Sequence, residues 1–129
     1  MSPTDQSTPS ETGDLPAVAY IRVASPSPAD QSAAVHRQRD AITRAADLLG
    51  LTVTEEFIDL GYSGMTLDRP GLRGLLDRAA TGHVGYCIVT QLDRFSRNPE
   101  HYADIDQALS DAGVAIVDAS RRPGEETTR

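Results

Sequence analysis

Four apolar runs alternate along this chain with three segments of helical periodicity, and this order restricts the folds open to it. The apolar runs occupy residues 17–23, 51–59, 83–92 and 114–119. The helical patterns lie between them, at residues 29–50, 69–82 and 99–113. Such an order is typical of right-handed βαβ crossovers around a parallel sheet. We therefore predict an α/β domain of three layers, in which helices flank a mainly parallel sheet of about four strands.

Within each helical segment the apolar residues recur at the spacing of one helix face, which predicts the side that packs on the sheet. The first face is made by Val35, Ile42, Ala45, Ala46 and Leu49, the second by Leu72, Leu75, Leu76 and Ala79, and the third by Tyr102, Ile105 and Leu109. The nearly continuous apolar run at 83–92 fits a central strand buried on both faces. Within it, the chain's single cysteine, Cys87, is expected to be a small buried apolar side chain.

The length of 129 residues suits one domain with a modest core. We assign residues 16–120 to that domain, residues 1–15 to a disordered N-terminal tail, and residues 121–129 to a C-terminal tail. No apolar run approaches the roughly 20 residues that a transmembrane helix needs, and the N-terminus lacks the features of a secretory signal. We therefore expect a cytoplasmic protein with no membrane partner.

The charge of the chain limits what it can bind. Its formal net charge is −7, and because phosphate binding needs a basic surface, we expect DNA binding by the chain alone to be weak. All 12 basic residues are arginine. Their positions matter more than the total, because a small basic pocket can exist within an acidic surface.

In a parallel sheet the functional site lies beyond the carboxyl ends of the strands, which here means the loops after residues 23, 59, 90 and 118. A glycine-rich phosphate loop is excluded, because the segment after the first strand, ASPSPADQ, contains no glycine. A receiver-type phosphorylation site is excluded as well, since the first strand contributes no acid. The histidines, His36, His83 and His101, lack the spacing of metal ligands. We expect no metal and no cofactor.

Arginine is what the strand ends do provide. Arg22 closes the first strand, Arg69 opens the second helix, and Arg94 and Arg97 follow the third strand, preceded by Asp93. An arginine in a parallel strand is costly unless it is paired or faces a polar site. Arginines gathered at one sheet edge would bind a phosphodiester, because guanidinium groups match phosphate oxygens. The alternative is a set of surface ion pairs with the many acids.

Five short blocks in this order resemble the catalytic domain of serine recombinases, the resolvase/invertase family. They are Tyr20-Ile21-Arg22-Val23-Ala24-Ser25 followed by Gln31, then Gln38-Arg39, then Asp59 with Gly61, Ser63 and Gly64, then Asp68-Arg69-Pro70-Gly71-Leu72, and finally Leu92-Asp93-Arg94-Phe95-Ser96-Arg97. The resemblance covers residues 17–120. It implies a resolvase-like fold and DNA recombination by metal-free phosphoryl transfer, in which a serine attacks the DNA and forms a phosphoserine intermediate.

The resemblance also implies roles for single residues. Arg22, Arg69, Arg94 and Arg97 would hold the phosphate and stabilise the charge that develops on it. Asp93 would orient an arginine, and Gln38 would support the site from the first helix.

One departure from the family concerns the nucleophile. The family's serine lies two residues after the first-strand arginine, where this chain has Ala24. Ser25 is adjacent, but one step along a strand points a side chain to the opposite face. Two interpretations follow: Ser25 acts as nucleophile because the chain bends there, or the domain cannot cleave DNA. Whether the chain is an enzyme depends on this point.

A second departure is length, since family members continue into a dimerising helix and a DNA-binding domain. The sequence predicts that the chain lacks these parts, and that its partners are DNA, further copies of itself or a full-length recombinase. Three hypotheses remain: a recombinase catalytic domain that acts with other subunits, a non-catalytic interaction module that modulates a full-length recombinase, and an unrelated anion-binding α/β domain.

Overall fold

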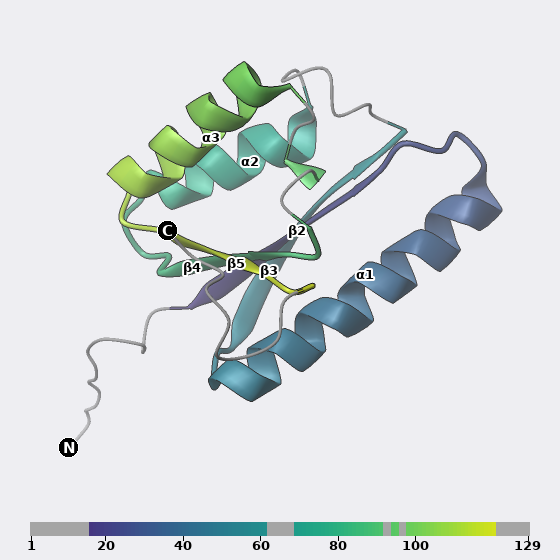
Figure 1. Ribbon diagram of the computed structural model, residues 1–129, viewed down its shortest axis with the longest axis horizontal. Helices are drawn as coiled ribbons and strands as arrows, with labels where there is room; N and C mark the ends of the chain where they lie inside the picture. Colours follow the sequence, from purple (N-terminus) through teal and green to yellow (C-terminus); the bar gives the residue numbers. More distant parts are fainter. Residues whose placement is uncertain (1–15, 62–68, 92–93, 96–97, 121–129) are drawn as a thin grey trace.

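Strands and helices alternate along the computed structural model, which describes residues 16–61, 69–91, 94–95 and 98–120 (Figure 1). In chain order the elements are β2 (Ala17–Val23), α1 (Pro28–Leu49), β3 (Val53–Leu60), α2 (Pro70–Ala79), β4 (Tyr86–Val89), α3 (Pro99–Asp111) and β5 (Ala115–Asp118). The predicted order of elements is confirmed. The two tails assigned from the sequence lie outside the described residues.

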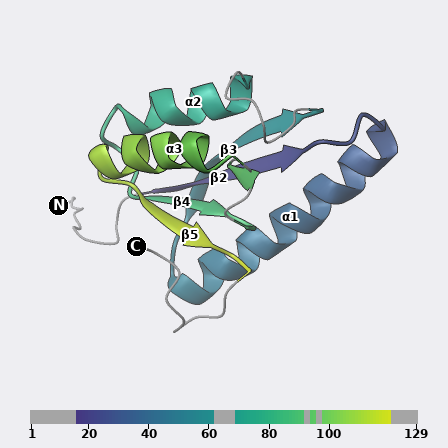
Figure 2. The same cartoon turned by 45° about the horizontal axis from the view of Figure 1, so that its top comes forward.

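The four strands form one sheet in the order β3-β2-β4-β5, and all three pairings are parallel. Helix α1 covers one face of this sheet, and α2 and α3 lie together on the other (Figures 1 and 2). The predicted three-layer α/β fold is therefore confirmed. The register pairs Arg22 at the end of β2 with Asp59 near the end of β3, which brings two functional candidates to the same edge.

Strand β2 is buried along its whole length, and its residues alternate between two cores, as the period of a strand requires. One core lies under α1 and contains Ala17, Ala19, Ile21, Val23, Ile42, Ala46, Ile88 and Val117. The other lies under α2 and α3 and includes Val18, Tyr20, Leu72, Leu75, Cys87, Phe95, Ile105 and Leu109. Tyr20 and Arg22 are two residues apart, so their side chains leave the strand on the same face, which α2 and α3 cover. The predicted burial of Cys87 is confirmed.

The end of α1 corrects one prediction. Leu49 was expected on the buried face, but it is 47% exposed. Gly50 adopts a left-handed conformation (φ 71°), and the amide of Leu51 donates to the carbonyl of Ala46 over 2.8 Å. This cap turns the chain so that Leu51, rather than Leu49, packs against the core.

Strand β4 is shorter than the apolar run that predicted it. The run spans residues 83–92, whereas the strand covers only Tyr86–Val89. Gly85 pairs outside the strand, donating to the carbonyl of Pro16 and accepting from Ala115. None of the helices in the described ranges is long and apolar enough to cross a membrane.

Candidate functional site

Arg22, at the carboxyl end of β2, is 1% exposed. Its Nε donates a hydrogen bond of 2.8 Å to the carbonyl oxygen of Arg94, in the loop that follows β4. The carbonyl of Arg22 accepts a bond of 3.1 Å from Nε2 of the buried side chain of Gln38, on α1. A buried guanidinium requires such partners, because leaving the charge unpaired would be very unfavourable. Arg22 therefore connects the sheet, α1 and the loop after β4.

Arg69 reaches the same carbonyl from the start of α2. Its side chain is fully buried, and Nη1 donates to the carbonyl of Arg94 at 3.2 Å and to the hydroxyl of Tyr20 at 3.0 Å. Nη2 donates to the carbonyl of Phe95. The guanidinium carbon lies 5.7 Å from the centroid of the Tyr20 ring, within the range of a cation–π contact. Two arginines from different elements thus hold one loop by its backbone.

Asp59 holds the first turn of α2, the helix that Arg69 precedes as its N-cap residue. Its carboxylate accepts 2.7 Å from the hydroxyl of Tyr20, 2.6 Å from the amide of Gly71 and 2.9 Å from the amide of Leu72. A negative charge at these first amides of α2 also complements the helix dipole. Burial, and after it the bond to Asp59, raises the pKa of the Tyr20 phenol well above its ordinary value. Tyr20 therefore stays protonated and keeps donating.

A cavity of about 280 Å³ opens beside this network, between α1 and the carboxyl ends of β4 and β5. We call it the edge cavity, and it is lined by Ala34, Arg37, Gln38, Ala41, Thr90, Gln91, Arg94 and Ser120. Three buried polar atoms of its lining have no hydrogen-bond partner among the described residues: Oε1 of Gln38, Oγ1 of Thr90 and Nε of Arg94. Buried polar atoms are normally satisfied, so these three indicate a place for a polar ligand or water.

The structure brings together four of the residues singled out in the sequence: Arg22, Gln38, Arg69 and Arg94. Their arrangement differs from the expected ring of guanidinium groups, because only Arg94 and Gln38 line the edge cavity, while Arg22 and Arg69 lie buried with donors on backbone carbonyls. Asp93 and Arg97 lie outside the described residues. Sequence reasoning did not assign roles to the Tyr20 hydroxyl or to Arg37. Two signals were available in the sequence. Tyr20 lies two residues before Arg22, on the same face of the strand, and Arg37 is adjacent to Gln38.

Ser25, the alternative nucleophile, is occupied by local contacts. Its Oγ accepts from the amide of Ser27 at 3.2 Å and donates to a carboxylate oxygen of Asp30 at 3.4 Å. Its carbonyl accepts 2.8 Å from Nε2 of Gln31. Ala24 is exposed and Ser25 is half-buried. Ser25 and Gln31 thus shape the turn that leads from β2 into α1.

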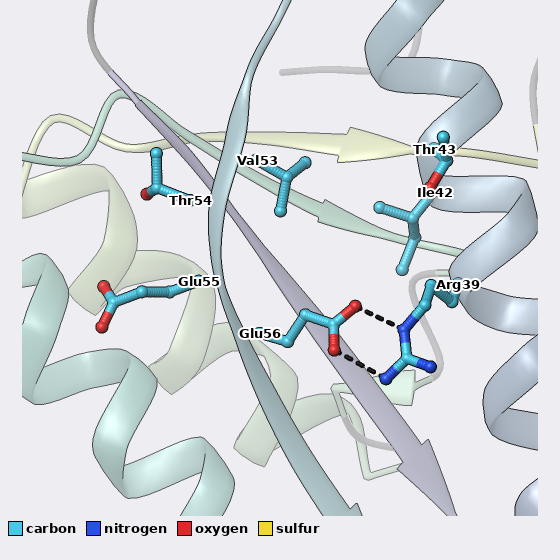
Figure 3. Close-up of a pocket in the computed structure, with 7 residues that line it drawn as sticks. All are labelled: Arg39, Ile42, Thr43, Val53, Thr54, Glu55 and Glu56. Atoms are coloured by element: carbon cyan, nitrogen blue, oxygen red, sulfur yellow. Dashed lines mark hydrogen bonds and ion pairs between the residues drawn. The ribbon is translucent and has the colours of Figure 1, made fainter.

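Arg39, next to Gln38 in the sequence motif, is not part of the lining of the edge cavity. It forms a bidentate pair with Glu56 on β3, with distances of 2.7 and 2.8 Å, beside a second cavity at the sheet edge (Figure 3). The hydrogen bond from Arg39 lowers the pKa of Glu56 below its ordinary value. Arg39 therefore links α1 to the edge strand. No cluster of three or more potential metal ligands occurs among residues 16–61, 69–91, 94–95 and 98–120.

The structure is a parallel four-stranded α/β domain with arginines gathered at its carboxyl edge. Comparison with known proteins identifies its family. The family model for the resolvase N-terminal domain matches residues 17–129. The chain belongs to this family. Its structural neighbours include the catalytic domains of an integrase and of a serine recombinase, TP901-1 integrase and ISC1926 TnpA.

Individual relatives agree with this assignment. A putative DNA recombinase from Bacillus subtilis (strain 168) is 28% identical over 98 residues, which are 76% of this chain and 19% of that protein. The C-terminal catalytic domain of ISC1926 TnpA, an IS607-like serine recombinase, superposes with a TM-score of 0.73 at 28% identity, covering 87% of this chain and 71% of that one. The catalytic domain of IS1535 TnpA gives 0.63 at 30% identity, covering 79% and 69%.

Proposed function

We propose that this domain binds a phosphate of the DNA backbone at the carboxyl edge of its sheet and does not itself cleave the strand. The observation that carries the binding proposal is the convergence of Arg22, Arg69 and Arg94 at this edge, next to a cavity with unsatisfied polar atoms. Guanidinium groups suit phosphate oxygens in both charge and geometry.

The three arginines have different roles in the proposed site. Arg22 and Arg69 hold the backbone of the loop at residues 94–95, so that Arg94 is placed at the edge cavity before the ligand arrives. Donors placed in advance stabilise charge without reorganisation. Asp93 and Arg97 belong to the same site by resemblance to the family, and remain part of the proposal.

The absence of cleavage follows from position 24. A methyl group cannot attack phosphorus, and phosphoryl transfer needs a nucleophile in line with the leaving group. The hydroxyl of Ser25 is bonded to Ser27 and Asp30, so a change of the turn would be needed to free it. We therefore place Ser25 in the turn and not at the phosphate.

DNA binding by the isolated chain tests the proposal. We expect the chain to bind a fluorescein-labelled duplex weakly, because its net charge is −7. The affinity should fall as salt is added, because the proposed contacts join arginines to phosphates. Arg94→Ala should weaken it by roughly five- to tenfold at low salt, and should lower the slope of log affinity against log salt by about 1. Arg44→Ala is the matched control, since Arg44 is an exposed arginine of α1 outside the edge cavity. Equal effects of the two substitutions, or nanomolar sequence-specific binding at physiological salt, would contradict the proposal.

A second candidate function is favoured by the same alanine. A domain that keeps the recombinase fold and lacks the hydroxyl could join an active recombinase as a non-catalytic subunit and modulate it, and further copies of the chain or a full-length recombinase are the proposed partners. Adding the chain to a full-length serine recombinase should then change that enzyme's strand-exchange rate. An unchanged rate at excess chain would exclude this function.

The domain limit at residue 120 and the cytoplasmic location stay predictions. The family match runs on to residue 129.

A further inference from the structure

We propose that Arg37 is a second phosphate-binding residue of the edge cavity, in addition to Arg94. This inference rests on the proposed function and adds a residue that the sequence motifs did not include. Arg37 and Gln38 are neighbours on α1, and both line the cavity, whereas Arg94 enters the lining from the loop after β4. A ligand in the cavity would therefore border two arginines that come from different elements of the fold.

The position of Arg37 is fixed by its neighbour. Gln38 is buried and bonded to the carbonyl of Arg22, which holds this turn of α1 against the end of β2. Arg37 itself is exposed, so its long side chain can adjust to a ligand while its backbone stays in place. A fixed base with an adjustable guanidinium suits the recognition of a backbone phosphate.

The charge of the lining supports an anionic ligand. It contains two arginines and no carboxylate among its described residues, in a chain with a net charge of −7. Within the described part of the chain neither Arg37 nor Arg94 forms an ion pair, whereas Arg39 pairs with Glu56 and Arg78 with Glu55. The carboxylate of Asp118 accepts from the amide and hydroxyl of Ser120 in the lining. Positive charge in the cavity is thus left for a ligand.

The unsatisfied atoms describe how a phosphate would be held. Nε of Arg94 and the hydroxyl of Thr90 are buried donors without a partner among the described residues, and each would gain an acceptor if a phosphate oxygen displaced the atoms that now cover it. Oε1 of Gln38 is an acceptor, and a water bound between it and the phosphate would satisfy it. The cavity volume of about 280 Å³ accommodates a phosphate group together with such a water.

The test uses the full chain and the same labelled DNA duplex, with Arg37→Ala, Arg37→Lys, Arg94→Ala and the control Arg44→Ala. Arg37→Ala should weaken binding roughly five- to tenfold at low salt and lower the salt slope by about 1, whereas Arg44→Ala should change the affinity less than twofold. Arg37→Lys keeps the charge but loses the planar fork, so it should retain the salt slope and part of the affinity. Thermal unfolding of Arg37→Ala should match that of the parent, because the side chain is exposed.

The outcomes separate this inference from the proposed function. If Arg37→Ala behaves as Arg44→Ala while Arg94→Ala loses affinity, the role of Arg37 is refuted and the phosphate site stands. If Arg94→Ala and Arg37→Ala both behave as the control, or if the parent chain does not bind DNA at low salt, both proposals fail.

Discussion

The hydroxyl of Tyr20 donates to the carboxylate of Asp59 over 2.7 Å, in a fully buried position between β2, β3 and the start of α2. The same hydroxyl accepts from Arg69, so one phenol oxygen connects a carboxylate to an arginine. We predict that Tyr20→Phe lowers the free energy of unfolding by about 1–3 kcal/mol, because it leaves buried polar groups with one partner fewer. Urea denaturation measures this difference. Tyr86→Phe is the control, since no bond to the Tyr86 hydroxyl is seen in the described region, and it should stay within about 0.5 kcal/mol of the parent.

A second prediction concerns Gly71. A Cβ atom at this position would lie 2.9 Å from the Cγ, Oδ1 and Oδ2 atoms of Asp59, closer than real contacts allow. Gly71→Ala should therefore destabilise the fold by about 1–3 kcal/mol, although alanine is the better helix former. Gly74→Ala is the matched control in the same helix, because its Cβ would meet only the edge of the Phe57 ring at 3.3 Å. Equal stability of the two variants in denaturant would show that Asp59 is free to move.

The Arg39–Glu56 pair should make a small, pH-dependent contribution to stability. Arg39 lowers the pKa of Glu56 in the folded state, so the stabilisation is present above the ordinary pKa of a glutamate and is lost as the pH falls through the lowered one. Because both side chains are partly exposed, the contribution should be about 0.2–1 kcal/mol, and salt should reduce it. We expect Glu56→Gln to be less stable than the parent at neutral pH and equal to it in strong acid. A difference that persists in acid would assign the effect to packing.

Cys87 should be unreactive in the folded protein. It is fully buried in β4, and burial raises the pKa of its thiol well above the ordinary value, so the thiolate needed for reaction is scarce. Labelling with a thiol reagent at about pH 8 should be slow in the native chain and fast in denaturant. Fast native labelling would mean that the β4 region opens much more often than global unfolding allows.

The sequence predicted the order of elements, the parallel sheet and most buried helix positions, because each of these depends on local periodicity. Residues such as Ile42, Leu72 and Leu109 lie in the core as the helix spacing indicated. The failure at Leu49 came from a cap geometry that redirects the chain within two residues. Such a cap depends on backbone angles rather than on the apolar pattern.

The candidate site was predictable only in part. Parallel topology places Arg22, Arg69 and Arg94 at one edge, since the carboxyl ends of parallel strands meet there. Whether an arginine faces solvent or lies under a loop depends on how residues 94–95 fold back, and no pattern in the sequence encodes this. The hydrogen bonds of Arg22 and Arg69 to the Arg94 carbonyl are therefore visible only in three dimensions.

We propose that this domain keeps phosphate-binding arginines of the recombinase site and lacks its nucleophile. The most direct test grafts residues 17–120 into a complete recombinase and incubates the chimera with a nicked DNA suicide substrate that traps covalent adducts. The parent chimera should form no adduct, and Ala24→Ser should form a phosphoserine link, because the added hydroxyl lies where the family's serine attacks. An adduct in the parent that Ser25→Ala abolishes would contradict the account and identify Ser25 as the nucleophile.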